Sequence, residues 1–124
     1  MKILTNNPLI RDQMHYDKFK IEYCNIDYLD ILRRGRDEIH RKKRLLTHPL
    51  YGSVKPNETV YRTLVLTDAK ELDFESLRFI EEAIQTAERF LKNSDPKDWP
   101  ERILNDFQVI DYDLIDHAIQ RMIL

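Results

Sequence analysis

The stretch Val60-Tyr61-Arg62-Thr63-Leu64-Val65-Leu66 contains the uninterrupted aliphatic run Leu64-Val65-Leu66. Successive side chains of a β-strand point to opposite faces, so an unbroken apolar run indicates a strand that is buried on both sides. We therefore predict a strand over residues 60–66, with other elements covering both of its faces.

Two further strands are predicted upstream of this stretch. Residues 2–5 form a short run of β-prone residues, Lys-Ile-Leu-Thr. Residues 19–24 alternate Phe19, Ile21 and Tyr23 with more polar neighbours. This period of two indicates a strand with one wetter face, which suits the edge of a sheet.

Helical patterns fill the intervals between the strands. Asn7 followed by a proline predicts a capped helix over residues 8–15, because proline is tolerated at the first helical position. Asp27 is expected to cap a second helix that runs to residue 46 and ends in a basic run at 41–44. Gly35 should weaken that helix by about 1 kcal/mol relative to alanine.

The C-terminal third is predicted to be helical. Residues 74–91, preceded by Asp73 as the cap, repeat apolar side chains every three or four positions. A capping-box pattern at 98–101 predicts a short helix. Asp111 is expected to start a last helix, whose apolar end at 122–124 should dock on the core or on another subunit.

The order of these elements predicts one α/β domain over residues 1–124. It has a small, three-stranded, mainly parallel sheet in the order 2-1-3, flanked by helices, and a helical C-terminal part. The alternative is an α+β arrangement with an antiparallel pair, because the crossover at 6–18 is near the minimum length for joining parallel strands.

Size and charge exclude several classes of protein. The chain has 124 residues, which suits one domain, and 20 basic against 22 acidic residues give a net charge of −2. Such a balance provides no field that would attract nucleic acid or anionic lipid. No run of 18 apolar residues or signal peptide is visible, so we expect a cytoplasmic protein.

Cofactor and metal motifs are missing from the sequence. The chain has two glycines, Gly35 and Gly52, which is too few for a glycine-rich phosphate loop. Cys24 is the sole cysteine, so an intramolecular disulfide cannot form, and we expect a buried, inert thiol. The four histidines lack the close spacing of metal ligands. The sequence therefore predicts neither a cofactor nor a metal.

A first candidate ligand site follows the opening strand. In open parallel sheets, ligands bind beyond the carboxyl ends of the strands. Thr5, Asn6 and Asn7 come at such an end, just before a helix N-terminus with unpaired N–H groups. Asp68, after the third predicted strand, would form the adjacent wall. These residues predict a site for a small anionic ligand, and the alternative is that Asn7 only caps and Asn6 only turns.

A second candidate is the long connection at residues 48–59. Loops of this length without regular structure are uncommon and are often functional. The ligand-binding candidates in this loop are His48, Ser53, Lys55 and Asn57. Their spacing matches no established catalytic arrangement, so the sequence leaves open an enzyme, a binding loop or an ordered structural loop.

Two stretches resemble those of a known family: the opening Met-Lys-Ile-Leu-Thr-Asn-Asn-Pro-Leu at 1–9, and Thr-His-Pro-Leu-Tyr-Gly-Ser-Val-Lys-Pro-Asn-Glu-Thr at 47–59. Both are similar to the GrdX family, small proteins encoded beside glycine, sarcosine or betaine reductase components of amino-acid-fermenting anaerobes. The resemblance implies a genomic setting, and it assigns no activity and no catalytic residue.

Three hypotheses follow. The first is a non-catalytic accessory protein that binds a small anionic ligand or a glycine reductase component. The second is a small enzyme that uses His48 or Lys55, which requires these side chains to converge with Asn6 or Asp68 around one concavity. The third is a structural subunit that forms a homodimer through the C-terminal helix. The sequence identifies neither the ligand nor the reductase component.

Overall fold

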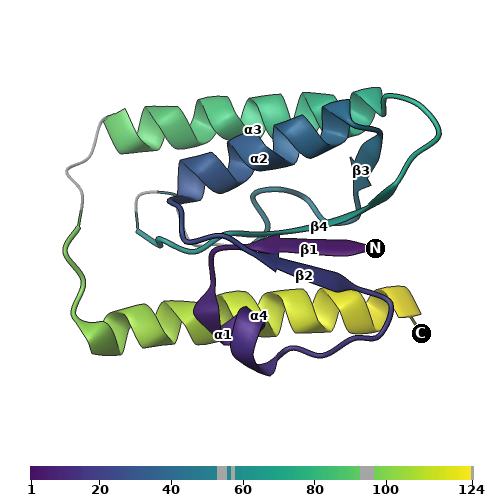
Figure 1. Ribbon diagram of the computed structural model, residues 1–124. Helices are drawn as coiled ribbons and strands as arrows, with labels where there is room; N and C mark the ends of the chain where they lie inside the picture. The colour runs from purple at the N-terminus through teal and green to yellow at the C-terminus, as the bar shows by residue number, and fades with distance from the viewer. Residues whose placement is uncertain (53–55, 57, 93–96, 124) are drawn as a thin grey trace.

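A computed structural model describes residues 1–52, 56, 58–92 and 97–123. In chain order the elements are β1 (Lys2–Thr5), α1 (Pro8–Gln13), β2 (Lys20–Tyr23), α2 (Tyr28–His40), β3 (Lys43–Leu45), β4 (Thr63–Asp68), α3 (Phe74–Lys92) and α4 (Glu101–Ile123). The sheet lies between two helical layers, with α2 and α3 on one face and α1 and α4 on the other (Figure 1).

The sheet has four strands in the order β2-β1-β4-β3. β1 pairs in parallel with β2, where Ile3 lies opposite Ile21, and in antiparallel with β4, where Thr5 lies opposite Thr63. The predicted α/β class, the central place of β1 and the edge position of β2 are confirmed. The prediction of three mainly parallel strands is wrong, because the sheet is mixed and has a fourth strand.

The sequence-based prediction lacked β3, and this explains why it gave β4 the wrong direction relative to β1. The second helix ends at His40 rather than at residue 46, and Lys42 adopts a left-handed backbone with φ of 67° that turns the chain into the sheet. β3 then pairs antiparallel to β4. The chain has thus crossed the sheet once more before β4 begins, so β4 returns antiparallel to β1.

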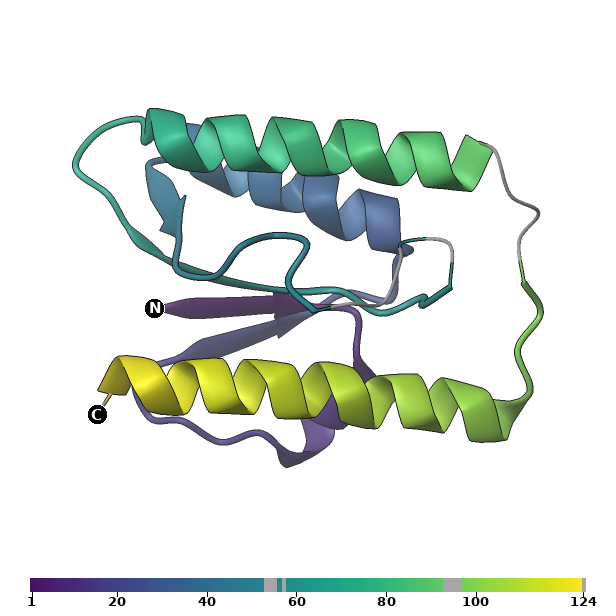
Figure 2. The same cartoon turned by 180° about the vertical axis from the view of Figure 1, so that it is seen from behind.

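The C-terminal helix also differs from the expectation. Two helices were predicted here, with Asp111 starting the second, but α4 is continuous. No glycine or proline follows Pro100, so nothing in the sequence forces a break. Asp111 lies in the middle of α4 and is buried, because its carboxylate faces the interior rather than capping a helix end. In Figure 2, α4 runs unbroken along one face of the sheet.

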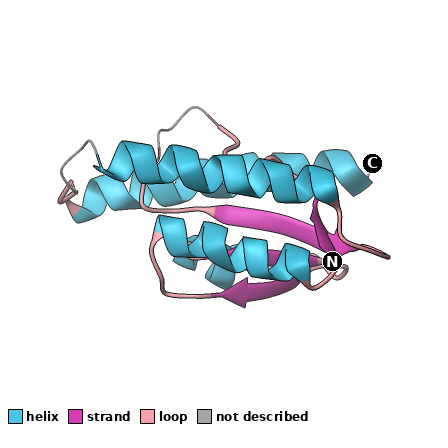
Figure 3. Cartoon of the chain, turned by 90° about the horizontal axis from the view of Figure 1, so that it is seen from above, coloured by secondary structure: helices cyan, strands magenta, loops and turns pink. Residues whose placement is uncertain are grey.

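The core has two parts, one on each face of the sheet. Leu4, Leu64 and Leu66 point to the α2–α3 side, whereas Ile3 and Val65 point to the α1–α4 side. The side chains at 64–66 are fully buried, which confirms that both faces of this strand are covered. Viewed from above, two helices lie side by side over the strands (Figure 3).

Gly35 brings α2 close to the sheet. A Cβ atom at this position would lie 2.3 Å from Cδ1 of the buried Leu64. The glycine therefore lowers helix propensity but permits close packing between α2 and β4. None of the described helices combines the length and apolarity that crossing a bilayer requires.

Candidate functional site

The three residues predicted at the end of β1 lie together, but inside the protein. Thr5, Asn6 and Asn7 are all buried. Asn7 Oδ1 accepts the N–H of Leu9 at 3.0 Å, which caps α1 as predicted. Thr5 Oγ1 accepts the N–H of Asn7 at 2.9 Å. The polar groups expected to face a ligand therefore hold the turn itself.

Asn6 connects three segments of the chain. Its Nδ2 donates to the carbonyl oxygens of Val60 at 2.8 Å and Ile26 at 2.9 Å. Its Oδ1 accepts the N–H of Arg62 at 2.8 Å. Each polar atom of this side chain already has a protein partner, so Asn6 fixes the connection that leads into β4.

Asp111 lies at the centre of a buried polar cluster. Its Oδ2 accepts hydrogen bonds from Asn7 Nδ2 at 3.0 Å and from Thr63 Oγ1 at 2.7 Å, and its Oδ1 accepts one from the Tyr51 hydroxyl. The Thr5 hydroxyl lies 2.7 Å from Thr63 Oγ1 and is free to donate to it. We call these five residues the Asp111 cluster. Its hydrogen bonds replace the water that a buried carboxylate loses.

The Tyr51 hydroxyl is held in its protonated form. Burial raises its pKa well above the usual value of 10.0, and the negative charge of Asp111 raises it further. A protonated phenol can donate to the carboxylate, whereas a phenolate would repel it. The cluster therefore depends on Tyr51 remaining neutral.

Arg62 borders this cluster as a buried cation. It is 3% exposed, and its Nη1 donates to the carbonyl oxygen of Tyr51 at 3.1 Å. The guanidinium carbon lies 4.3 Å from the ring centroid of Tyr51 and 4.9 Å from that of Tyr28. Within the part of the chain that the structure describes, no carboxylate forms an ion pair with it, so the two aromatic rings are its main stabilising contacts.

The Nε atom of Arg62 and the hydroxyl of the adjacent Tyr28 have no hydrogen-bond partner among the described residues. A cavity of about 10 Å³ beside Arg62 and Asp111 has room for about one water molecule. The described residues therefore leave room beside the Asp111 cluster for little more than a water molecule.

A larger hollow opens on the other side of Tyr28. It has a volume of about 170 Å³ and is lined by Asp27, Tyr28, Leu29, Pro56, Thr59, Val60, Leu91, Lys97 and Trp99. We call it the Trp99 hollow. It lies where α2 begins and α3 ends, at the end of the molecule opposite both chain termini (Figure 1). Trp99 Nε1 donates to the carbonyl oxygen of Glu58 at 2.7 Å, which fixes the indole as one wall.

The other predicted site residues lie apart from Thr5, Asn6 and Asn7. His48 is exposed, its Nδ1 accepts the N–H of Leu50 at 3.0 Å, and its ring packs against Phe79. Asp68 lies opposite Lys43 and binds it, and this hydrogen bond lowers the pKa of Asp68.

The expected wall formed by Asp68 beside Thr5 is wrong, because antiparallel pairing places Thr63 opposite Thr5 and carries Asp68 to the other end of the sheet. The remaining candidates, Ser53, Lys55 and Asn57, lie outside the described residues.

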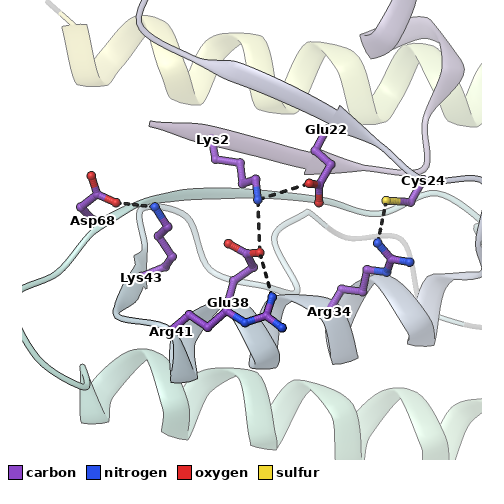
Figure 4. Close-up of polar contacts among 8 residues, drawn as sticks. All are labelled: Lys2, Glu22, Cys24, Arg34, Glu38, Arg41, Lys43 and Asp68. Atoms are coloured by element: carbon purple, nitrogen blue, oxygen red, sulfur yellow. Dashed lines mark hydrogen bonds and ion pairs between the residues drawn. The ribbon is translucent and has the colours of Figure 1, made fainter.

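Ion pairs on the sheet edge tie β1 and β2 to α2 (Figure 4). Lys2 Nζ lies 3.2 Å from Glu38 Oε1 and 3.4 Å from Glu22 Oε1. Burial lowers the pKa of Lys2, but its contacts with Glu38 and Glu22 outweigh this effect and raise it overall.

Cys24 is half-buried rather than buried, and its Sγ accepts a hydrogen bond from Arg34 at 3.4 Å.

Metal binding finds no structural support in the described part of the chain. No three His, Cys, Asp or Glu side chains come close enough there to hold an ion.

Sequence reasoning missed Asp111 and Arg62, although a signal was present for each. Arg62 is a charged residue within a stretch predicted to be buried on both faces. Asp111 stands between the apolar pair Val109-Ile110 and the aromatic Tyr112. Charged residues are rarely fully buried unless they have a structural or functional role.

Comparison with known proteins identifies a matching family. The family described as GrdX-like protein matches residues 2–120. No curated protein and no solved structure matches the chain. Because the match spans nearly the whole sequence, the chain belongs to the GrdX-like protein family.

Proposed function

We propose that this protein is a non-catalytic accessory protein that binds a ligand or a protein component in glycine reductase-type amino-acid fermentation. The observation that carries this proposal is the contrast between the Asp111 cluster and the Trp99 hollow. The polar side chains that come together around Asp111 are bonded to one another, and all are buried except the half-buried Tyr51. The open hollow has mainly apolar and aromatic walls, which suit binding better than chemistry.

The geometry of His48 favours binding over catalysis. The enzyme hypothesis requires His48 or Lys55 to approach Asn6 or Asp68, and Lys55 lies outside the described residues. Instead, His48 faces a hollow next to Ser76 and Phe79, at which neither Asn6 nor Asp68 is present. The imidazole is exposed, and its Nδ1 is already engaged by the N–H of Leu50 in its own loop.

Family membership supports the link to a reductase. The resemblance to the GrdX family implies a setting beside glycine, sarcosine or betaine reductase components. A small protein encoded beside the reductase components is well suited to bind one of these components or a metabolite that the components share.

The test is size-exclusion chromatography of the purified chain, mixed in turn with each purified glycine reductase component. We expect the chain to co-elute with one component and not with serum albumin, which serves as the control. If no component shifts its elution volume, the proposed partner is wrong.

A second candidate function is a structural subunit that dimerises through α4. Apolar side chains stay exposed along this helix: Val109 is 49% exposed, and Ile110, Leu114 and Met122 are between 38% and 42% exposed. Sedimentation should then show a dimer that Val109→Glu converts to a monomer. A monomeric wild-type chain would exclude this function.

A further inference from the structure

We infer that the edge strand β2 is a contact surface for a second copy of this chain, so that two β2 strands pair in antiparallel and join two sheets into one. The inference goes beyond the proposed function, because it concerns the surface between copies and requires no reductase component. It also differs from a dimer formed through α4, since the contact lies at the edge of the sheet.

The outer edge of β2 has backbone groups available for pairing. β2 comes first in the strand order β2-β1-β4-β3, so it has a neighbouring strand on one side only. The N–H of Lys20 donates to the carbonyl oxygen of Met1 at 2.8 Å, on the β1 side. Because backbone groups alternate in direction along a strand, those of Ile21 and Tyr23 point away from β1. Within the described part of the chain, no hydrogen bond reaches these outward groups.

The opposite edge of the sheet, β3, is less suited to pairing. The N–H of Leu45 donates to Ser76 Oγ of α3 at 2.9 Å, so a helix side chain already occupies an outward group of this strand. Two of its three residues, Lys43 and Arg44, are cations, which would repel the same strand of a second copy. Of the two described edges, β2 is therefore the one open to another strand.

The charges of β2 complement those of its own copy. Lys20 and Glu22 lie on the same face of the strand, one on either side of Ile21. An antiparallel pair centred on Ile21 places each Lys20 opposite Glu22 of the second copy, which gives two pairs of opposite charge. Centring the pair on Lys20 or on Glu22 would place like charges opposite each other, which is unfavourable. Charge therefore favours the register centred on Ile21 over these two.

Lys20 would otherwise protect this edge. A lysine on an edge strand discourages pairing, because pairing brings its charge against another chain. In the favoured register Lys20 instead meets Glu22, whose side chain is 38% exposed and whose Oε1 lies 3.4 Å from Lys2 Nζ (Figure 4). A carboxylate has two oxygens and about four acceptor positions, so Glu22 can bind both lysines at once.

The other face of the strand supplies apolar contact. In the same register Ile21 lies opposite its own copy, and Tyr23 lies opposite Phe19, which precedes β2. Ile21 and Tyr23 are half-buried in the single chain, so a second copy can cover the remaining surface. Aromatic and β-branched side chains that lie opposite each other stabilise paired strands.

The test is sedimentation equilibrium of the wild-type chain and of two charge-reversal variants. We expect a wild-type dimer whose fraction rises with concentration. Lys20→Glu and Glu22→Lys each place like charges opposite in both pairs, so each should raise the dissociation constant of the dimer by about tenfold. When the two variants are mixed in equal amounts, opposite charges face each other again, and the mixture should form a dimer with about the wild-type dissociation constant. Such recovery on mixing requires both variants to be folded.

Two control variants locate the contact. Lys92→Glu makes the same charge reversal at an exposed position in the last turn of α3, and it should leave the dimer unchanged. Val109→Glu, on the exposed face of α4, should also leave the dimer unchanged, whereas it would dissociate a dimer formed through α4.

The inference is overturned if the wild-type chain stays monomeric up to about 1 mM. It is also overturned if the mixed variants are no more dimeric than either variant alone, or if Val109→Glu dissociates the dimer and the two β2 variants do not.

Discussion

The Asp111 cluster and the Trp99 hollow lie on either side of Arg62 and Tyr28, yet they are built in opposite ways. In the cluster, the Asp111 carboxylate has three hydrogen-bond donors, and the adjacent cavity is no larger than a water molecule. The hollow has a volume of about 170 Å³. Tyr28 lines it, and the hydroxyl of Tyr28 has no hydrogen-bond partner among the described residues.

The difference separates a structural role from a binding role. Polar groups that satisfy one another inside a protein specify its fold, because leaving one of them unpaired is costly. An open space lined by apolar and aromatic side chains can instead cover the apolar part of a bound molecule. We therefore assign the cluster to the fold, and the hollow is where the proposed binding function has room.

The largest expected effect comes from Asp111→Ala. This change leaves the donors of Asn7, Tyr51 and Thr63 buried without their acceptor, and we expect a loss of about 3–5 kcal/mol in the free energy of unfolding. Urea denaturation measures the loss. Asp113→Ala, at an exposed position of the same helix, is the matched control and should cost less than about 0.5 kcal/mol. Equal losses in the two variants would show that the cluster does not stabilise the fold.

Tyr51→Phe should produce the second-largest effect. It removes one donor to the Asp111 carboxylate but keeps the ring that packs against Arg62. We expect a loss of about 1–3 kcal/mol, which is typical when a hydrogen bond to a charged group is removed. The same denaturation experiment at pH 7 detects it. A change below about 0.5 kcal/mol would contradict the assignment of this hydroxyl to the fold.

The fate of these residues shows which parts of the structure the sequence could predict. Asn7 and Asp27 were recognised as caps because capping depends on residues a few positions apart. The burial of Leu64, Val65 and Leu66 was likewise visible as a local apolar run. The capping residues and the apolar run can both be recognised without knowing which distant segments of the chain contact one another.

The direction of β4 and the role of Asp111 were not predictable in this way. Asp111 was interpreted as a cap, since a short acidic side chain before an apolar run has the same local pattern as a helix start. Its partners Asn7, Tyr51 and Thr63 lie 104, 60 and 48 positions away in the chain. Such contacts can be foreseen only from the correct topology. The predicted topology was wrong because it lacked the three-residue strand β3.

Alkaline pH should weaken the protein through the two tyrosines that flank Arg62. Burial raises the pKa of both Tyr28 and Tyr51 above 10.0 in the folded chain, whereas unfolding restores the ordinary value. Above pH 10 the unfolded state therefore binds fewer protons than the folded state, and the free energy of unfolding falls as pH rises. Their contribution is fully present below pH 10.

Denaturation between pH 8 and pH 11 checks this dependence. The fall should be shallower in Tyr51→Phe than in the wild type, because one of the shifted phenols is missing. If the two proteins show parallel pH profiles, the Tyr51 hydroxyl does not retain its proton as the cluster requires.

The smallest expected change in stability comes from Tyr28→Phe. This variant removes a buried hydroxyl that has no hydrogen-bond partner among the described residues, and it keeps the ring against Arg62. The free energy of unfolding should change by less than about 0.5 kcal/mol, because no protein hydrogen bond is lost. Tyr51→Phe is the matched comparison, because it removes a hydroxyl that does bond to Asp111 and should lose about 1–3 kcal/mol. If both variants lose stability equally, the Tyr28 hydroxyl has an internal partner in solution and belongs to the fold, and the distinction between cluster and hollow fails at the residue that joins them.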